Sequence, residues 1–320
     1  MSDVAAIANL VEKHIALKRE IAKVIVGQEE VVDQILLSIY TGGHSLLIGV
    51  PGLAKTLMVN TIAQTLGLDF KRIQFTPDLM PSDILGTSIF NVKTLEFEFK
   101  KGPLFSNIIL IDEINRAPAK TQAALFEAMA ERQITMDGIQ YPMAPPFLVF
   151  ATQNPIEQEG TYRLPEAQLD RFLFKIEVPY PSLEEEVRIL EKKHALRSMV
   201  EEDLVQPLLS ASQIAHYQEK IKEIIVERNL LKYIASIVEN TRSNANLYLG
   251  ASPRASIAIL NASKALAAIN GRDFVSPDDI KKVAIPVLGH RIIPSPEREM
   301  EGLTAVEVVK QILDNIEIPR

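Results

Sequence analysis

The sequence predicts an α/β domain with a parallel sheet, followed by a small all-helical domain. Two observations carry this prediction. Short apolar runs suited to buried strands alternate with amphipathic helical segments up to about residue 180. After the two prolines of Val178–Ser182, the strand signal almost disappears and helical spacing continues. We therefore expect a core domain at residues 1–180 and a helical domain at residues 183–320.

The first half of the core alternates helices and strands. Apolar residues recur at helical spacing before and after Gly27, and a short apolar run follows the second helix. Expected elements are helices at 3–23 and 29–40, a strand at 45–48, a helix at 55–66 closed by Gly67, and a strand at 71–75. Residues 76–106 form an irregular insertion, in which the alternation at 95–99 predicts one strand of a hairpin.

The second half of the core begins with residues 107–111, a continuous apolar run typical of a strand buried on both faces. An amphipathic helix is expected at 120–132 and a hairpin at 133–141, where Asp137-Gly138 suits a type I′ turn. Further strands are expected at 147–152 and 172–178.

The helical domain opens on a predicted capping box of Ser182 and Glu185. Ser276-Pro277 marks another helix start, because proline fits the first turn of a helix. Helices are expected at 183–196, 211–226, 230–242, 253–270 and 276–285.

Composition excludes several classes of function. The chain has no cysteine, which rules out disulfides, thiolate metal sites and thiol catalysis, and its five histidines show no ligand spacing. It shows neither a signal peptide nor an apolar run of about 20 residues, so we expect a cytoplasmic protein without a membrane span. The net charge of −7 disfavours broad nucleic-acid binding.

The segment Gly49–Thr56 (GVPGLAKT) lies between a predicted strand and a predicted helix, the context of a phosphate-binding loop. In such a loop Lys55 neutralises phosphate oxygens and the Thr56 hydroxyl binds Mg²⁺. The common pattern has glycine where this chain has Ala54. Because the loop becomes helix at that point, we expect a negative φ at Ala54, which a methyl group tolerates. An incidental glycine–proline turn is the competing interpretation.

Asp112 and Glu113 follow the apolar run that ends at Ile111. Acids at the carboxyl end of a buried strand face the crevice where open α/β sheets bind ligands, so Asp112 is expected to hold Mg²⁺ and Glu113 to polarise water. An exposed loop with two acids is the alternative. Asn154 ends another strand and could orient that water. Arg171, and Arg254 at the start of a helix, are candidate phosphate ligands, although either could be an ordinary surface residue.

Taken together, these motifs resemble those of the AAA+ ATPases, specifically the MoxR branch, whose loop also carries the alanine. The similarity covers about residues 20–295. The matching stretches are Val26–Gln28, Gly49–Thr56, Phe75–Leu79, Asp83–Gly86, Ile111–Pro118, Ala151–Pro155, Leu164–Phe172, Ser252–Ala255 and His290–Ile292.

This resemblance implies a P-loop αβα core with a helical lid, and a role for each motif residue. Lys55 and Thr56 correspond to Walker A, Asp112 and Glu113 to Walker B, and Asn154 to sensor 1. Arg171 resembles the finger that reaches a neighbouring subunit, and Arg254 resembles sensor 2, acting on its own subunit's nucleotide. The implied nucleotide contacts are Val26, Gly27, Gln28, Gly49, Pro51, Gly52, Leu53, Ala54, Lys55, Thr56, Leu57 and Arg254. Arg163 stands where relatives often carry proline, which leaves open whether Arg163 or Arg171 is the finger.

The resemblance further implies a homo-oligomeric ring, commonly a hexamer, that hydrolyses ATP to ADP with Mg²⁺. Such rings remodel or activate partner proteins, often ones with von Willebrand factor A domains. The 76–106 insertion and the 133–141 hairpin would then face the pore or the upper rim. A nucleic-acid ring motor is the main alternative, which the acidic charge disfavours. A non-catalytic scaffold and a GTPase are less favoured, the latter because no Asn-Lys-x-Asp segment is present.

Overall fold

The computed structural model describes residues 3–156, 162, 164–196 and 204–318. Its centre is a parallel sheet of five strands, which confirms the predicted α/β class. In spatial order the strands are β2 (Phe70–Gln74), β5 (Ile108–Asp112), β8 (Leu148–Gln153), β1 (Ser45–Ile48) and β9 (Phe174–Glu177).

The sheet is buried on both faces because successive strand residues point to opposite sides. In β5, Ile108 and Leu110 join one hydrophobic cluster, whereas Ile109 and Ile111 join the other. This explains why the central strands have no polar alternation in the sequence. The two faces are covered by different helices.

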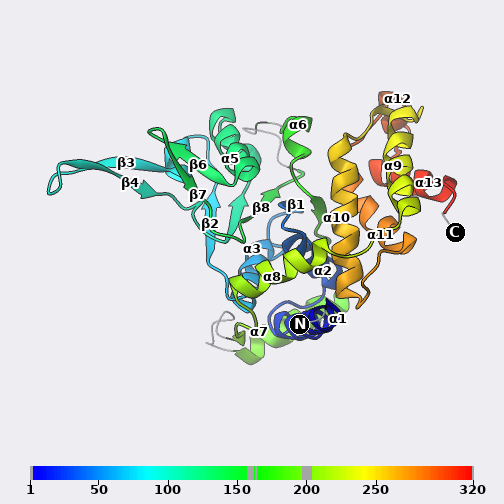
Figure 1. Cartoon of the computed structure of the whole chain (residues 1–320), viewed down its shortest axis with the longest axis horizontal. Coiled ribbons are helices and arrows are strands. Elements are labelled where there is room, and N and C mark those ends of the chain that lie inside the picture. The colour runs from blue at the N-terminus through cyan, green and yellow to red at the C-terminus, as the bar shows by residue number, and fades with distance from the viewer. Residues whose placement is uncertain (1–2, 157–161, 163, 197–203, 319–320) are drawn as a thin grey trace.

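Helices from the first part of the chain cover one face, together with part of the second domain. The first cluster holds side chains of α1 (Asp3–Ile21), α2 (Glu29–Thr41) and α3 (Lys55–Thr65). The other face is covered by α5 (Ala119–Glu131), through Leu125, Phe126 and Met129. Figure 1 shows these layers around the sheet.

The predicted insertion is a short helix, α4 (Pro81–Leu85), and a hairpin of β3 (Gly86–Asn91) and β4 (Glu96–Lys101) that extends away from the core (Figure 1). A second hairpin, β6 (Gln133–Met136) and β7 (Ile139–Pro142), packs beside it. The predicted type I′ turn is confirmed, since Asp137 and Gly138 have φ of 52° and 79°. Ser88 donates to Asp137, and the rings of Phe99 and Tyr141 lie 4.4 Å apart. The two hairpins are therefore joined.

The second part of the chain is mainly helical, as predicted, and the predicted capping box at Ser182 forms. The helix start predicted at Ser276 also carries a capping box, with Asp279. Three features of this part were not predicted: the last two helices, and a small strand pair β10–β11. The elements are α6 (Glu166–Leu169) before β9, then α7 (Leu183–Leu196), α8 (Ala211–Lys222), α9 (Arg228–Ser243), β10 (Leu247–Leu249), α10 (Pro253–Ile269), α11 (Pro277–Leu288), β11 (Ile293–Pro294), α12 (Pro296–Met300) and α13 (Ala305–Asn315).

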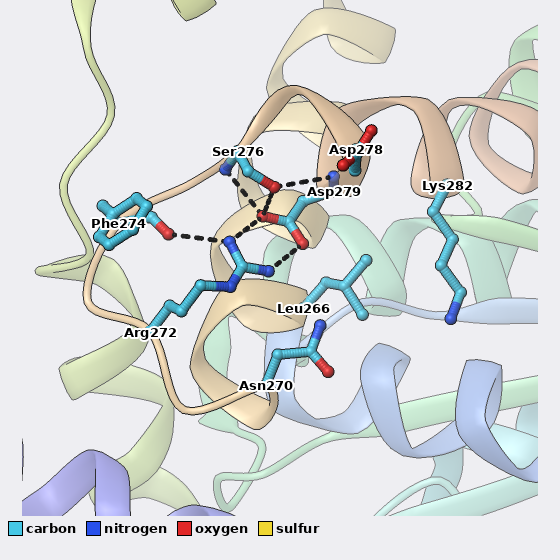
Figure 2. A pocket seen from close by; sticks show the side chains of 8 residues that line it. All are labelled: Leu266, Asn270, Arg272, Phe274, Ser276, Asp278, Asp279 and Lys282. Carbon is cyan, nitrogen blue, oxygen red and sulfur yellow. Dashed lines mark hydrogen bonds and ion pairs between the residues drawn. The ribbon is translucent and has the colours of Figure 1, made fainter.

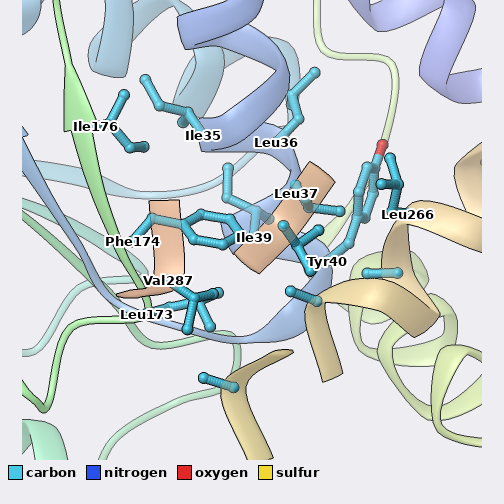
Figure 3. Close-up of a cluster of buried hydrophobic side chains, with 14 of the residues drawn as sticks. Ile35, Leu36, Leu37, Ile39, Tyr40, Leu173, Phe174, Ile176, Leu266 and Val287 are labelled. Atoms are coloured by element: carbon cyan, nitrogen blue, oxygen red, sulfur yellow. The ribbon is translucent and has the colours of Figure 1, made fainter. Parts of the chain in front are cut away.

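The helical part shares a continuous core with the sheet. Figure 3 shows Leu266 of α10 and Val287 of α11 beside Tyr40 of α2 and Phe174 of β9. Because one hydrophobic cluster crosses this junction, movement of the helical part would disturb contacts on the sheet. Among the described helices, none has the length and apolar content needed to span a bilayer.

Candidate active site

The predicted phosphate loop, the Asp112-Glu113 pair and Asn154 meet at one end of the sheet. Each follows the carboxyl end of a parallel strand, and β1, β5 and β8 are neighbours. The backbone N–H of Gly49 donates to the carbonyl of Gln153 over 3.4 Å, which joins the loop to the end of β8. This is the edge where open α/β sheets bind ligands.

The backbone at Ala54 differs from the prediction. Its φ is 55° and its ψ 24°, so it lies in the left-handed region and the expectation of a negative φ is wrong. The Ala54 carbonyl already accepts the helical hydrogen bond from Met58 N–H at 2.8 Å. The chain thus enters α3 through a left-handed cap, and the methyl group of alanine makes that conformation costly. Gly52, with φ of 89°, is the position where glycine meets the backbone demand.

Lys55 lies inside the loop that precedes it. Its Nζ donates to the carbonyls of Gly49 and Val50 at 2.7 and 2.8 Å. Burial lowers the pKa of the Lys55 ammonium, while the negative charges of Asp112 and Glu113 act in the opposite direction. The loop therefore holds a cation close to both carboxylates.

The other loop residues divide between anchors and exposed backbone. Leu53 is buried and Leu57 packs against the main core, whereas Pro51 and Gly52 are exposed. A Cβ added at Gly52 would meet no atom within 4 Å. The backbone at the loop tip is therefore open to a ligand.

Asp112 is buried, and both of its carboxylate oxygens have partners. Oδ1 accepts a hydrogen bond from the Thr152 hydroxyl at 3.1 Å. Oδ2 lies 2.6 Å from Arg72 Nε and 3.5 Å from the Thr56 hydroxyl. Neither Thr152 nor Arg72 was predicted as a site residue from the sequence. A polar residue at the end of the apolar run 147–152 was the available signal for Thr152.

Glu113 is held in an unusual backbone conformation, with φ of 56°. Its N–H donates to Thr152 Oγ1 at 3.0 Å. Its carboxylate accepts from Gln74 Nε2 at 2.7 Å and pairs with Arg116 at 3.1 Å. A non-glycine residue with positive φ is found mainly where function or packing requires it. Gln74 and Arg116 were not predicted.

The donor set at Asp112 suits Mg²⁺ when phosphate shares the ion. A carboxylate and a hydroxyl are hard oxygen ligands of the type Mg²⁺ prefers. Within the described part of the chain, no group of three or more His, Asp or Glu side chains could hold a metal ion by itself. Mg²⁺ is usually held by one or two carboxylates together with substrate phosphates, and Asp112 and Thr56 fit that arrangement.

The predicted base-binding segment lies near the same edge. Gly27 and Gln28 have φ of 67° and 57°, and Gln28 Nε2 lies 3.4 Å from the Pro179 carbonyl. A Cβ at Gly49 would lie 3.0 Å from the carbonyl of Val178. The segment Val26–Gln28 and the phosphate loop therefore flank the same connection after β9.

Asn154 follows β8 beside the loop, as predicted, and it is half-buried. Its Oδ1 accepts from the backbone N–H of Ile156 at 3.2 Å, which is a local turn contact. The amide nitrogen of Asn154 is the group left to meet a ligand.

Arg171 and Arg254 lie at the other end of the sheet. The residues before β9 meet the start of β1, since Leu173 N–H donates to the His44 carbonyl. Four residues of β1, at about 3.3 Å each, separate this end from the phosphate loop by roughly 13 Å. Figure 1 accordingly shows α6 and α7, which flank β9 in sequence, on opposite sides of the sheet.

Arg254 lies 3.9 Å from Asp170, the neighbour of Arg171. This contact places Arg254 at the end of the sheet that carries Asp170, and its action on its own subunit's nucleotide stays a prediction. Arg171 donates through Nη1 to the Phe126 carbonyl at 2.9 Å. The competing candidate, Arg163, lies outside the described residues.

Comparison with known proteins agrees with this geometry. The chain is 44% identical over 310 residues to the chaperone MoxR1 of Mycobacterium tuberculosis, covering 94% of this chain and 81% of that protein. A model of the ATPase family associated with various cellular activities (AAA) matches residues 44–174, and an AAA lid domain model matches residues 239–312.

The chain belongs to the MoxR family of AAA+ ATPases.

Two further similar proteins are consistent with this family. YeaC, an uncharacterised protein of Bacillus subtilis, is 45% identical over 302 residues, which cover 93% of this chain and 92% of YeaC. The crystal structure of a candidate ATPase from Cytophaga hutchinsonii superposes with a TM-score of 0.91 at 44% identity, over 99% of this chain and 98% of that one. This MoxR protein is an ATPase with a chaperone-like role.

Proposed function

We propose that this MoxR ATPase hydrolyses ATP at the edge formed by β1, β5 and β8, within a ring of identical subunits, and that it uses the energy to remodel or activate partner proteins. The observation that carries the proposal is the convergence of Lys55, Thr56, Asp112 and Glu113 at one end of the sheet. Thr152 supports it, because its hydroxyl contacts both the Asp112 carboxylate and the Glu113 N–H.

In this proposal each group has one task. Lys55 exchanges its loop carbonyls for phosphate oxygens, and the backbone of the loop contacts the same phosphates. Asp112 and Thr56 would hold Mg²⁺, which when bound neutralises phosphate charge. Glu113 accepts a proton from water and Asn154 orients that water. The segment Val26–Gln28 contacts the base.

The arginines support a ring. Arg171 and Arg254 lie at the end of the sheet opposite to their own phosphate loop, and the four residues of β1 between the two ends span roughly 13 Å. We therefore propose that they reach the nucleotide of a neighbouring subunit. Arg171 uses one N–H on Phe126, and a guanidinium has five donors, so others are left for phosphate. We call the end of the sheet where Arg171 and Arg254 lie the arginine edge. A ring, commonly a hexamer, places the arginine edge of each subunit at the phosphate loop of its neighbour.

The joined hairpins are the proposed contact with partner proteins. The β3–β4 hairpin exposes Val92, Leu95 and Phe97 at 77%, 72% and 74% of their surface. Exposed apolar side chains grouped on a projecting element commonly mark a site of interaction. Proteins with von Willebrand factor A domains are the partner class that we propose to test first.

The first test concerns hydrolysis. We expect Lys55→Ala to abolish nucleotide binding, and Glu113→Gln to bind ATP but not turn it over. If Glu113→Gln hydrolyses ATP at the parent rate, Glu113 is not the base. Mixing Arg171→Ala subunits with Glu113→Gln subunits should recover activity at mixed interfaces, and assembled rings that recover none would exclude a finger acting between subunits.

The second test concerns partners. Glu113→Gln rings loaded with ATP should retain a purified von Willebrand factor A protein, and Phe97→Ser should release it without changing ATP hydrolysis. Retention that survives Phe97→Ser would place the contact elsewhere. DNA added in the same assay separates the alternative, since a nucleic-acid motor would hydrolyse ATP faster in its presence.

A further inference from the structure

Asp170 connects the core to the lid at the arginine edge. Its Oδ1 pairs with Arg291 Nε at 2.8 Å. Its Oδ2 accepts from the Ser252 hydroxyl at 2.9 Å and lies 3.9 Å from Arg254 Nη1. One carboxylate thus contacts three side chains of the lid, while its own backbone adjoins Arg171.

The contact with Arg291 is fixed. The Arg291 side chain is only 3% exposed. Its guanidinium also donates to the carbonyls of Asp170 and Leu173 at 3.1 and 3.0 Å, and to those of Phe172 and Val287. A buried guanidinium with all these acceptors satisfied has no low-energy alternative position, so it anchors the end of α11 to residues 170–173.

The contact with Arg254 is different. The Arg254 side chain is 61% exposed and its distance to Asp170 is near the limit for an ion pair. Exposed pairs of this kind contribute little to stability, so Arg254 can leave Asp170 for a better anion. Ser252 caps α10 by accepting from Arg254 N–H and also donates to Asp170, so the first turn of α10 stays in place when the Arg254 side chain moves.

We propose that Asp170 is a positioning residue, which holds Arg254 of the lid beside Arg171 of the core so that both cations meet a neighbouring subunit's phosphate together. This inference rests on the proposed function of the two arginines. A phosphate carries more charge than one carboxylate and accepts bidentate hydrogen bonds from guanidinium, so it can replace Asp170 as the partner of Arg254. Arg291 keeps its ion pair with Asp170 during this exchange, so residues 170–173 stay in place relative to the lid.

The test compares Asp170→Asn with a matched control in the lid. Asp279 is buried, pairs with Arg272 at 2.6 Å, and accepts from the backbone N–H and the hydroxyl of Ser276, the cap of α11, as Figure 2 shows. Asp279→Asn therefore breaks a buried Arg–Asp pair of similar kind that does not contact the arginine edge. Both variants should lower thermal stability by similar amounts.

Only Asp170→Asn should slow hydrolysis. We expect kcat to fall about tenfold, the effect of misplacing one charged contact, with KM and the Kd for an ATP analogue unchanged. Adding Asp170→Asn to Arg254→Ala should cause little further loss of kcat, because Asp170 acts through Arg254. Ser252→Ala, which keeps the carboxylate, gives a milder form of the same kcat effect and serves if Asp170→Asn does not fold.

The outcomes separate the two proposals. If Arg254→Ala lowers kcat but Asp170→Asn does not, or if Asp279→Asn lowers it equally, Asp170 does not position the cations. If Arg254→Ala itself leaves kcat unchanged, the role of Arg254 under the proposed function fails, and the inference fails with it.

Discussion

The left-handed backbone at Ala54 makes an unusual prediction for a phosphate loop: replacing this residue by glycine should stabilise the protein. Ala54 has φ of 55° and is exposed, so its methyl group adds backbone strain and little burial. The left-handed region costs an L-residue roughly 1–2 kcal/mol. Glycine removes that cost but gains freedom in the unfolded chain worth about 0.4–1 kcal/mol.

The difference predicts that Ala54→Gly raises the free energy of unfolding by roughly 0.8 kcal/mol, from the midpoints of these two ranges. Gly52→Ala is the matched control three positions before Lys55. Its φ is 89° and an added Cβ would meet nothing within 4 Å, so only the backbone term applies. It should therefore lower the free energy of unfolding by a similar amount, roughly 0.8 kcal/mol.

Urea unfolding followed by circular dichroism measures both changes, since the chain has no tryptophan to report by fluorescence. An Ala54→Gly protein that is less stable than the parent protein would exclude a costly backbone conformation at Ala54. A Gly52→Ala protein that is more stable than the parent would exclude it as well, because the two variants must shift in opposite directions.

Two further predictions concern ionisation and metal binding. His44 is buried, accepts from Val149 N–H at 2.9 Å, and burial lowers its pKa to about 4. Because only the unfolded chain takes up this proton between pH 6.5 and 4, His44 should cost roughly 2 kcal/mol of stability between pH 6.5 and 5. The urea midpoint should depend less on pH in His44→Gln than in the parent protein. Part of the pH dependence remains, because burial also lowers the pKa values of His14 and His290. An unchanged pH dependence of the midpoint would contradict this role of His44. Arg72→Gln should lower the Mg²⁺ concentration for half-maximal ATP hydrolysis about fivefold, since the ion pair of the half-exposed Arg72 with Asp112, worth about 1 kcal/mol, competes with the metal. Lys71→Gln, an exposed cation on the same strand, should have a smaller effect, and a higher Mg²⁺ requirement in Arg72→Gln would exclude this competition.

The sequence by itself determined the fold class, most helices and strands, and the motif residues at the phosphate-loop end of the sheet. Strands such as Ile108–Asp112 were predictable because a continuous apolar run has few other stable environments. The helix at Ala305–Asn315 was missed even though Thr304 and Glu307 form a capping box, a local signal that was present in the sequence. We could expect Lys55, Thr56, Asp112 and Glu113 at one end of the sheet, because they follow strands of a parallel sheet, whose carboxyl ends lie together.

Only the tertiary structure decided the partners of those residues and the location of the arginines. Thr152 and Arg72 reach Asp112 from strands 40 residues away in either direction along the chain, which no local pattern encodes. Arg254 and Asp170 are 84 positions apart, and their contact depends on how the lid packs on the sheet. The sign of φ at Ala54 likewise depends on how the loop closes over Lys55, since the preference of alanine alone predicts the opposite. Local chemistry fixes which groups are available, whereas long-range packing fixes which of them meet.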